Sequence, residues 1–234
     1  MSTAIASSQS PAVRIDVAPL RRPDHADYLT LLDLITDGES LPAGVDQILA
    51  LPPFQRPFTH GPALCLTAHP RRSPNPKPVG AVFASLPEWA YEHPLCQSDP
   101  ALSDLLAHTV ISIHGVAVAA HRRRQGIARA LLTQAEDRAR DAGYRLSTLI
   151  HKPELAPFYQ RLGYATARHI TVVVPPDAAL GTTQPHAFMT AVKPLARDVH
   201  VRELPGAPGL VVTGLWPGSD LPPTAHFHSG RLIA

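Results

Sequence analysis

The sequence has few cysteines, few aromatic residues and little excess of charge of either sign. Its two cysteines, Cys65 and Cys96, lie far apart in unrelated surroundings, which excludes a disulfide framework and a CxxC metal knuckle. The formal net charge is +2, a value that gives no support to a nucleic-acid-binding or membrane-surface role. No apolar run approaches the roughly 18 residues of a membrane-spanning helix. We therefore expect a soluble, cytoplasmic protein with two reduced thiols and with no membrane or nucleic-acid partner.

The two ends of the chain lack the patterns of folded segments. Residues 1–12 are rich in serine and alanine but have no basic segment followed by an apolar core, so we expect a disordered leader and not a signal peptide. Residues 13–195 are expected to form one domain. Residues 196–234 are rich in proline and glycine, and we expect an extension that packs on the main domain or on a partner subunit. A homodimer is therefore one arrangement that the sequence leaves open.

Hydrophobic patterning predicts alternating strands and helices in the main domain. The β-branched run 109–118 indicates a strand. The helix after it has apolar residues three and four positions apart between Ala128 and Ala139. Residues 69–78 contain four prolines, which indicate an exposed loop. Residues 87–100 are interpreted as irregular. Further strands are expected at 13–20, 63–68, 79–86, 146–150, 170–174 and 187–192 in one sheet and at 209–216, and further helices at 23–37, 44–49 and 154–161.

The most informative segment is the strand, loop and helix between Val116 and Leu132. The first amides of a helix have no partner within the helix and carry partial positive charge, so a helix that opens directly after a strand is suited to bind a phosphate group. Gly126 has no side chain and Ala128 has a small one, which lets an anion approach the backbone. The alternative is that 122–124 is a solvated basic turn and that Gly126 only shapes it.

This segment resembles the cofactor loop of the GNAT acetyltransferases, whose signature Arg/Gln-x-x-Gly-x-Gly/Ala is met by Arg123, Gly126 and Ala128. Residues 155–164, Leu-Ala-Pro-Phe-Tyr-Gln-Arg-Leu-Gly-Tyr, resemble the second signature of the family, an aromatic–tyrosine pair before a Leu-Gly-aromatic turn. Both signatures stand in family order at family spacing. The nearest likeness is to the arylalkylamine (serotonin) N-acetyltransferases. Their strand before the loop carries a His-x-His pair, where this chain has Ser112 and His114.

The resemblance implies the GNAT fold, an α/β (α+β) architecture with a mixed, mostly antiparallel central sheet and helices on both faces. It also implies acetyl-CoA as the co-substrate and no metal. In the family the strand at 109–118 separates from the strand at 146–150. The pantetheine arm lies in that gap, and the amides of the helix-opening loop hold the pyrophosphate. The cofactor-binding residues predicted in this way are Val116, Ala117, Val118, Arg123, Arg124, Gln125, Gly126, Ile127, Ala128, Arg129 and Tyr159.

The expected reaction is direct transfer of an acetyl group to a small aromatic or otherwise apolar primary amine in a ternary complex. The amine must lose a proton, and histidine titrates near neutral pH, so His114 with water held by Ser112 is the predicted acceptor. The hydroxyl of Tyr159 is the predicted proton donor to the leaving thiolate. The alternatives are a strand histidine with local hydrogen bonds for His114 and a packed aromatic residue for Tyr159.

Two other functions and several weaker site candidates stay open at this point. The chain is alternatively a protein N-terminal or lysine acetyltransferase, or a non-catalytic acyl-CoA sensor. His151 ends the strand that faces the cofactor strand, and it either lines the site or is an ordinary loop histidine. Trp89, with its neighbours Glu88 and Tyr91, covers the amine pocket or belongs to the core. His226 and His228 have no third ligand nearby, so no metal is expected there.

Overall fold

The computed structural model describes residues 15–35, 63–71, 77–91, 93–175 and 178–234. Three expectations fall on residues outside these ranges: the leader at 1–12, the helix at 44–49, and the segment 38–44 that corresponds to a substrate-covering segment in the resembled family. The helix expected at 23–37 and the loop expected at 69–78 lie partly outside these ranges.

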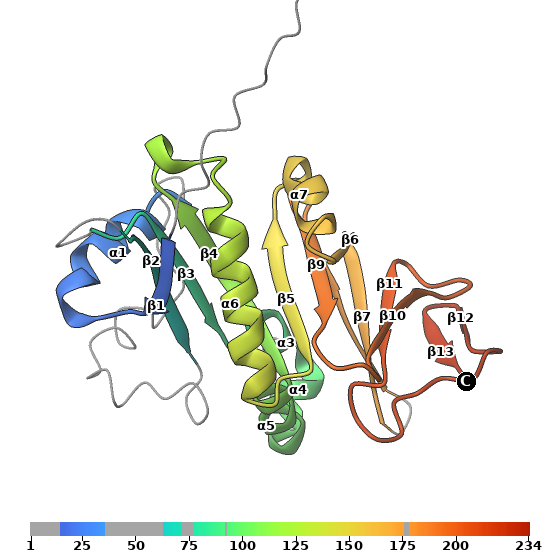
Figure 1. The fold of residues 1–234 in the computed structure, drawn as a ribbon. Helices are drawn as coiled ribbons and strands as arrows, with labels where there is room; N and C mark the ends of the chain where they lie inside the picture. The colour runs from blue at the N-terminus through green and yellow to red at the C-terminus, as the bar shows by residue number, and fades with distance from the viewer. Residues whose placement is uncertain (1–14, 36–62, 72–76, 92, 176–177) are drawn as a thin grey trace, which may run out of the picture.

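Seven strands form the main sheet of the described residues, in the order β1-β2-β3-β4-β5-β9-β6 (Figure 1). Within this sheet β4 and β5 run parallel, and the other neighbouring pairs run antiparallel. The prediction of a mixed, mostly antiparallel sheet is therefore confirmed. The strands are β1 (Ile15–Pro19), β2 (Leu64–Pro70), β3 (Gly80–Ser85), β4 (Val110–Val118), β5 (Leu146–His151), β6 (Ala165–Ala167) and β9 (Met189–Pro194).

Helices cover both faces of this sheet, and the alternation of side chains along the strands explains how. Val82 of β3 packs in one hydrophobic cluster with Leu131. The next residue, Phe83, packs on the opposite face with Tyr28. Successive residues of a strand point to opposite faces, so one strand contributes to both layers. The first face is covered by α6 (Ile127–Asp141) and α7 (Ala156–Gln160), and the second by α1 (His25–Leu32), α3 (Glu88–Tyr91), α4 (Pro94–Ser98) and α5 (Pro100–Thr109).

The expectation that 87–100 is irregular is wrong. The segment holds α3, α4 and the start of α5, and two of its prolines stand in the first turns of helices. Proline is tolerated there because the first amides of a helix have no partner within the helix. The carboxylate of Asp99 accepts hydrogen bonds from the amides of Ala101 and Leu102, which caps α5. Prolines that suggest a loop thus mark helix starts.

The strand expected at 170–174 forms, but it does not join the main sheet. As β7 (His169–Val174) it belongs to a second, four-stranded sheet in the order β10-β11-β7-β8. The reason is that β9 already pairs with β5 along one edge and with β6 along the other. β8 (Ala178–Thr183) precedes the boundary expected at 195, whereas β10 (His200–Glu203) and β11 (Leu210–Thr213) follow it. The strand expected within 209–216 is confirmed as β11, which pairs parallel with β7.

Residues after 195 pack against the main sheet through polar and apolar contacts. Arg145, at the start of β5, donates hydrogen bonds to the carbonyls of Leu215 and Gly214, at 2.9 and 3.1 Å. The indole of Trp216 donates to Thr109 Oγ1 at 3.1 Å, and its ring is buried. A short hairpin of β12 (His226–His228) and β13 (Arg231–Ile233) completes the described chain. The segment 196–234 is therefore in contact with the main sheet.

The described residues contain neither a membrane-spanning helix nor a cluster of metal-ligating side chains. No helix among them is both long enough and apolar enough to cross a membrane. In the same ranges, no group of three or more histidine, cysteine, aspartate or glutamate side chains is arranged to hold a metal ion. Cys65 and Cys96 are both buried, and they form no disulfide with each other.

Candidate active site

β4 and β5 lie side by side over only the first part of β4. Their parallel pairing starts at Val110 and ends with the pair Ile113 and Leu149. Past this pair, within the described residues, β4 continues to Val118 paired with β3 alone, and β5 continues to His151 paired with β9 alone. The two strands therefore separate inside the sheet, as predicted (Figure 1). An extended ligand that carries amide groups can pair with such an open strand edge.

A β-bulge in β4 lies at the point of separation. Two successive residues of β3 pair with Gly115 and Ile113, so His114 is the extra residue of β4. A bulge bends a strand and increases its local twist. It also changes which residues face α6, because Ile113 packs in the α6 cluster and the next residues of β4 to do so are Val116 and Val118. The bulge thus turns the second half of β4 away from β5.

The bulge residue His114 is held by its neighbours on β3. Its Nε2 lies 2.9 Å from Ser85 Oγ and 3.1 Å from the carbonyl oxygen of Leu86. A carbonyl oxygen can only accept, so Nε2 carries a hydrogen in this arrangement. The ring also lies 5.4 Å from the ring of Phe83, centre to centre. These contacts orient the imidazole, and its role as proton acceptor stays a prediction.

Ser112, which is predicted to hold water for proton transfer to His114, lies on the face of the sheet that α3 covers. This serine is buried and pairs across the strands with Thr148. The indole of Trp89 lies 3.5 Å from Thr148 Oγ1, within reach of a weak hydrogen bond. Two residues further along β5, on the same side of the strand, Ile150 is 48% exposed. An indole and an exposed aliphatic side chain therefore flank the opening on this face.

The loop from β4 to α6 contains two residues with left-handed backbone. Arg124 has a φ of 61° although it is not glycine, and Gly126 has a φ of 80° and is the N-cap residue of α6. Left-handed backbone costs a residue with a side chain about 1–2 kcal/mol, so the conformation of Arg124 lowers the stability of the turn. Arg123 anchors the turn, because its Nε donates a hydrogen bond of 3.2 Å to the carbonyl of Val118.

The amino-terminal end of α6 is open for an anion. No side chain caps it, and its first turn contains no acidic residue. A Cβ added at Gly126 would meet no atom within 4 Å, so there is space directly in front of the helix. Ile127 is buried and fixes the first turn on the sheet. Of the other predicted loop residues, Arg123, Arg124, Gln125 and Arg129 are exposed and Ala128 is half-buried.

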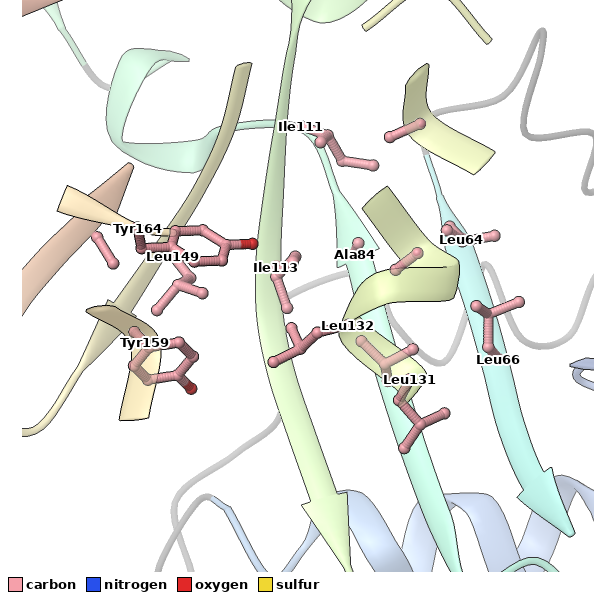
Figure 2. Close-up of a cluster of buried hydrophobic side chains, with 14 of the residues drawn as sticks. Leu64, Leu66, Ala84, Ile111, Ile113, Leu131, Leu132, Leu149, Tyr159 and Tyr164 are labelled. Atoms are coloured by element: carbon pink, nitrogen blue, oxygen red, sulfur yellow. The ribbon is translucent and has the colours of Figure 1, made fainter. Parts of the chain in front are cut away.

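Tyr159, on α7, lies at the β5 side of the α6 cluster. Figure 2 shows it with Tyr164 beside Leu149. Its side chain is buried, and among the described residues its hydroxyl has no hydrogen-bond partner. Burial raises the pKa of Tyr159 to about 12. The backbone around it is fixed, since its carbonyl accepts hydrogen bonds from the amides of Leu162 and Tyr164. The group is therefore a rigid, protonated hydrogen-bond donor.

His151 is the last residue of β5, just past the point where β4 leaves. It is only 4% exposed, and its ring centre lies 4.9 Å from that of Tyr159. Its Nδ1 lies 2.8 Å from the carbonyl oxygen of Lys152, while its Nε2 is buried with no hydrogen-bond partner in the described chain. The structure thus brings His151 and Tyr159 together. It places His114 on the opposite face of the sheet from the α6 cluster.

A buried polar network behind Tyr159 was not anticipated from the sequence. Glu136 of α6 accepts a hydrogen bond of 2.9 Å from Tyr164 and forms an ion pair with Lys193 of β9. Ser147 of β5 completes the network at 3.1 Å from the Tyr164 hydroxyl. Burial, and next the charge of Glu136, raise the pKa of Tyr164 well above its ordinary value. The sequence contained a signal, because Glu136 lies on the apolar stripe of its helix.

The profile of the acetyltransferase (GNAT) family matches residues 47–164, about half of the chain. This range contains both strands of the opening, the helix-opening loop and Tyr159. No curated protein matches the chain in a sequence comparison.

Several solved structures resemble the chain at low identity. The NatC complex bound to Gag peptide and CoA contains a chain that is 17% identical with a TM-score of 0.50, over 78% of this chain and 99% of that one. YhbS of Escherichia coli in complex with CoA is 20% identical with a TM-score of 0.48, over 82% and 87%. NAA60 of Arabidopsis thaliana in complex with acetyl-CoA is 17% identical with a TM-score of 0.48, over 77% and 98%. At such identities, the likeness to the NatC chain speaks for a common fold alone.

Proposed function

Because the chain belongs to the GNAT acetyltransferase family, we propose that it transfers an acetyl group from acetyl-CoA to a small, apolar or aromatic primary amine. The family makes it an acetyl-CoA-dependent acetyltransferase with the GNAT fold. The acceptor, the residues that hold the cofactor and the residues that move protons are the content of the proposal.

The open strand edge and the uncapped helix carry the cofactor part of the proposal. The arm of acetyl-CoA contains amide groups, which pair with the backbone of Val116–Val118 where β4 no longer faces β5. The pyrophosphate sits at the amides of 124–129, where a glycine, open space and no acidic side chain favour an anion. Arg123, Arg124 and Arg129 add positive charge around this position. Acetyl-CoA supplies the acetyl thioester, and the chain supplies its placement.

Proton transfer is assigned to two sides of the opening. Tyr159 donates a proton to the leaving sulfur. Burial raises the pKa of Tyr159 to about 12, which keeps the hydroxyl protonated at ordinary pH and also makes it a weaker acid, so its part in the step rests on its position beside the opening. His114, with water at Ser112, takes a proton from the amine on the other face. A primary amine with a pKa near that of lysine, about 10.4, is less than a thousandth unprotonated at pH 7, so a nearby acceptor is needed. The contacts of His114 leave a hydrogen on Nε2, so the proton from the amine goes to Nδ1 of the oriented ring.

The preference for an apolar amine rests on the flank of the opening that carries Trp89 and Ile150. An exposed isoleucine at the end of a central strand offers apolar contact to a substrate, and the indole adds a flat face for an aromatic one. The likeness of 155–161 to the arylalkylamine N-acetyltransferases supports the same class of acceptor.

A panel of acceptors assayed with acetyl-CoA, with release of free thiol as the signal, tests this function. We expect arylalkylamines and apolar alkylamines to be acetylated with higher kcat/KM than polar diamines, free lysine or peptide N-termini. A chain that acetylates only peptide N-termini or lysine side chains would overturn the acceptor class. Tight acetyl-CoA binding without turnover on any acceptor would instead identify a sensor.

A further inference from the structure

His151 has an unusual hydrogen-bonding state for a buried histidine. A carbonyl oxygen can only accept, so the Nδ1 of His151, 2.8 Å from the carbonyl oxygen of Lys152, carries the hydrogen of the neutral ring. The lone pair is then on Nε2. This nitrogen is buried and accepts no hydrogen bond in the described part of the chain. Buried acceptors without a donor are rare in folded proteins because they lose their water and gain nothing in return.

The position of His151 suggests where a donor would come from. Its residue lies two positions past Leu149, the last residue of β5 that pairs with β4. Its ring packs against Tyr159, whose hydroxyl is a donor and also has no partner among the described residues. Two neighbouring side chains at the opening thus present one buried acceptor without a donor, Nε2 of His151, and one hydroxyl donor, that of Tyr159. A ligand with both a donor and an acceptor would satisfy the two together.

We propose that His151 is a further residue of the acetyl-transfer site and that its Nε2 accepts a hydrogen bond from an N–H group of a bound reactant. This proposal rests on the proposed function. The reactants offer such a group in two places: the amides of the cofactor arm and the nitrogen of the acceptor amine. Because the rings of His151 and Tyr159 are adjacent, a reactant whose N–H group donates to His151 also lies close to Tyr159. His151 therefore positions a reactant, and no covalent step at its ring is involved.

Nitrogen NMR of the full-length protein with ¹⁵N-labelled histidine tests the hydrogen bond directly. His151→Phe assigns the resonance. In the free protein we expect Nε2 to show the chemical shift of an imidazole nitrogen with an unbonded lone pair. Addition of CoA should move it toward the shift of a hydrogen-bonded nitrogen if the cofactor arm is the donor. If the amine is the donor, the shift should need CoA and an arylalkylamine together. An Nε2 shift that stays unchanged in both titrations overturns the proposal.

His151→Phe also provides a binding test, because phenylalanine keeps a ring against Tyr159 and removes the acceptor. We expect the affinity for CoA to fall, or the KM for the amine to rise, by about tenfold. This is the scale of one lost hydrogen bond whose partner is left unsatisfied. His108→Phe is the matched control, since His108 also has its Nδ1 2.8 Å from a backbone carbonyl but lies exposed on α5. Unchanged binding and KM in His151→Phe overturn the proposal.

The two proposals fail in different ways. If CoA shifts Nε2 but no amine is acetylated, the acceptor class is wrong and the role of His151 stands. If amines are acetylated but Nε2 responds to neither reactant, the role of His151 is wrong and the acceptor class stands. The titrations use the wild-type protein, and His151→Gln assigns the resonance if His151→Phe does not fold.

Discussion

Gly80 of β3 lies directly beneath the first turn of α6, against Ile127. A Cβ placed on Gly80 would be 2.9 Å from Ile127 Cγ2, closer than real Cβ atoms come, and 3.0 Å from Leu131 Cδ1, a tight contact. With any side chain at this position, Ile127 and the helix whose amino-terminal end is proposed to hold the pyrophosphate would have to shift. The position of the anion site depends on a residue that the ligand does not touch.

The first prediction concerns this contact. Gly80→Ala and Gly80→Val should displace the first turn of α6 by increasing amounts, and overpacking should lower the free energy of unfolding by about 1–3 kcal/mol in the larger variant. Calorimetry should find CoA affinity lower in Gly80→Val than in Gly80→Ala, and lower in Gly80→Ala than in the wild type. Equal CoA affinity in all three folded proteins would show that CoA binding does not depend on the position of the first turn of α6.

The second prediction concerns Gly126. In Gly126→Val the side chain enters the open space in front of α6, so CoA affinity should fall tenfold or more, which corresponds to about 1.4 kcal/mol per factor of ten. Gly143→Val is the matched control. Gly143 has a φ of 92° with no atom within 4 Å of an added Cβ, and it follows the other end of α6. Both variants share the cost of left-handed backbone, and only the first should lose CoA affinity by calorimetry.

The third prediction concerns Tyr159. Tyr159→Phe removes only the hydroxyl, so folding and CoA affinity should be retained while kcat falls by about 100-fold, the range of general acid catalysis. Tyr144→Phe is a suitable control, because Tyr144 is buried to the same extent in the same cluster. Wild-type kcat in Tyr159→Phe at saturating substrate would leave Tyr159 as a packing residue.

The raised pKa of Tyr159 gives a fourth prediction with a defined sign. The folded-state pKa of about 12 is higher than the ordinary tyrosine value of about 10, so the folded state holds this proton more tightly. Its contribution to stability is complete below about pH 10 and is lost as the pH rises toward 12. Ultraviolet titration should therefore find one phenol ionising near pH 12 that is absent from Tyr159→Phe. Ionisation of that phenol near pH 10 would contradict its burial.

The fifth prediction concerns His114. Because the amine needs a proton acceptor, kcat of His114→Ala should fall by about 100-fold while CoA affinity is retained. Ser85→Ala removes the hydroxyl 2.9 Å from Nε2 and should lower kcat less, because the contact with the Leu86 carbonyl remains. Wild-type kcat in His114→Ala at saturating substrate would make His114 a structural residue of the bulge.

Some features of this protein follow from local sequence. The β-branched run at 110–118 and the apolar spacing from Ile127 to Ala139 predict a strand and a helix because both patterns act within one element. The loop between them is also local, since Gly126 is the residue that tolerates a φ of 80° at least cost. The family signatures and the fold class were therefore available from the sequence alone.

Other features depend on contacts between distant residues. The second sheet exists because β6 and β5 occupy both edges of β9, and a strand pattern does not say which edge is free. Glu136 is tolerated on an apolar stripe because Lys193 and Tyr164 meet it from elsewhere in the chain. The bulge at His114 depends on its register with β3, and the orphan nitrogen of His151 on its packing against Tyr159. Local propensity determined the elements, and the pairing of strands, which no single segment encodes, decided where β4 and β5 separate and which side chains face that opening.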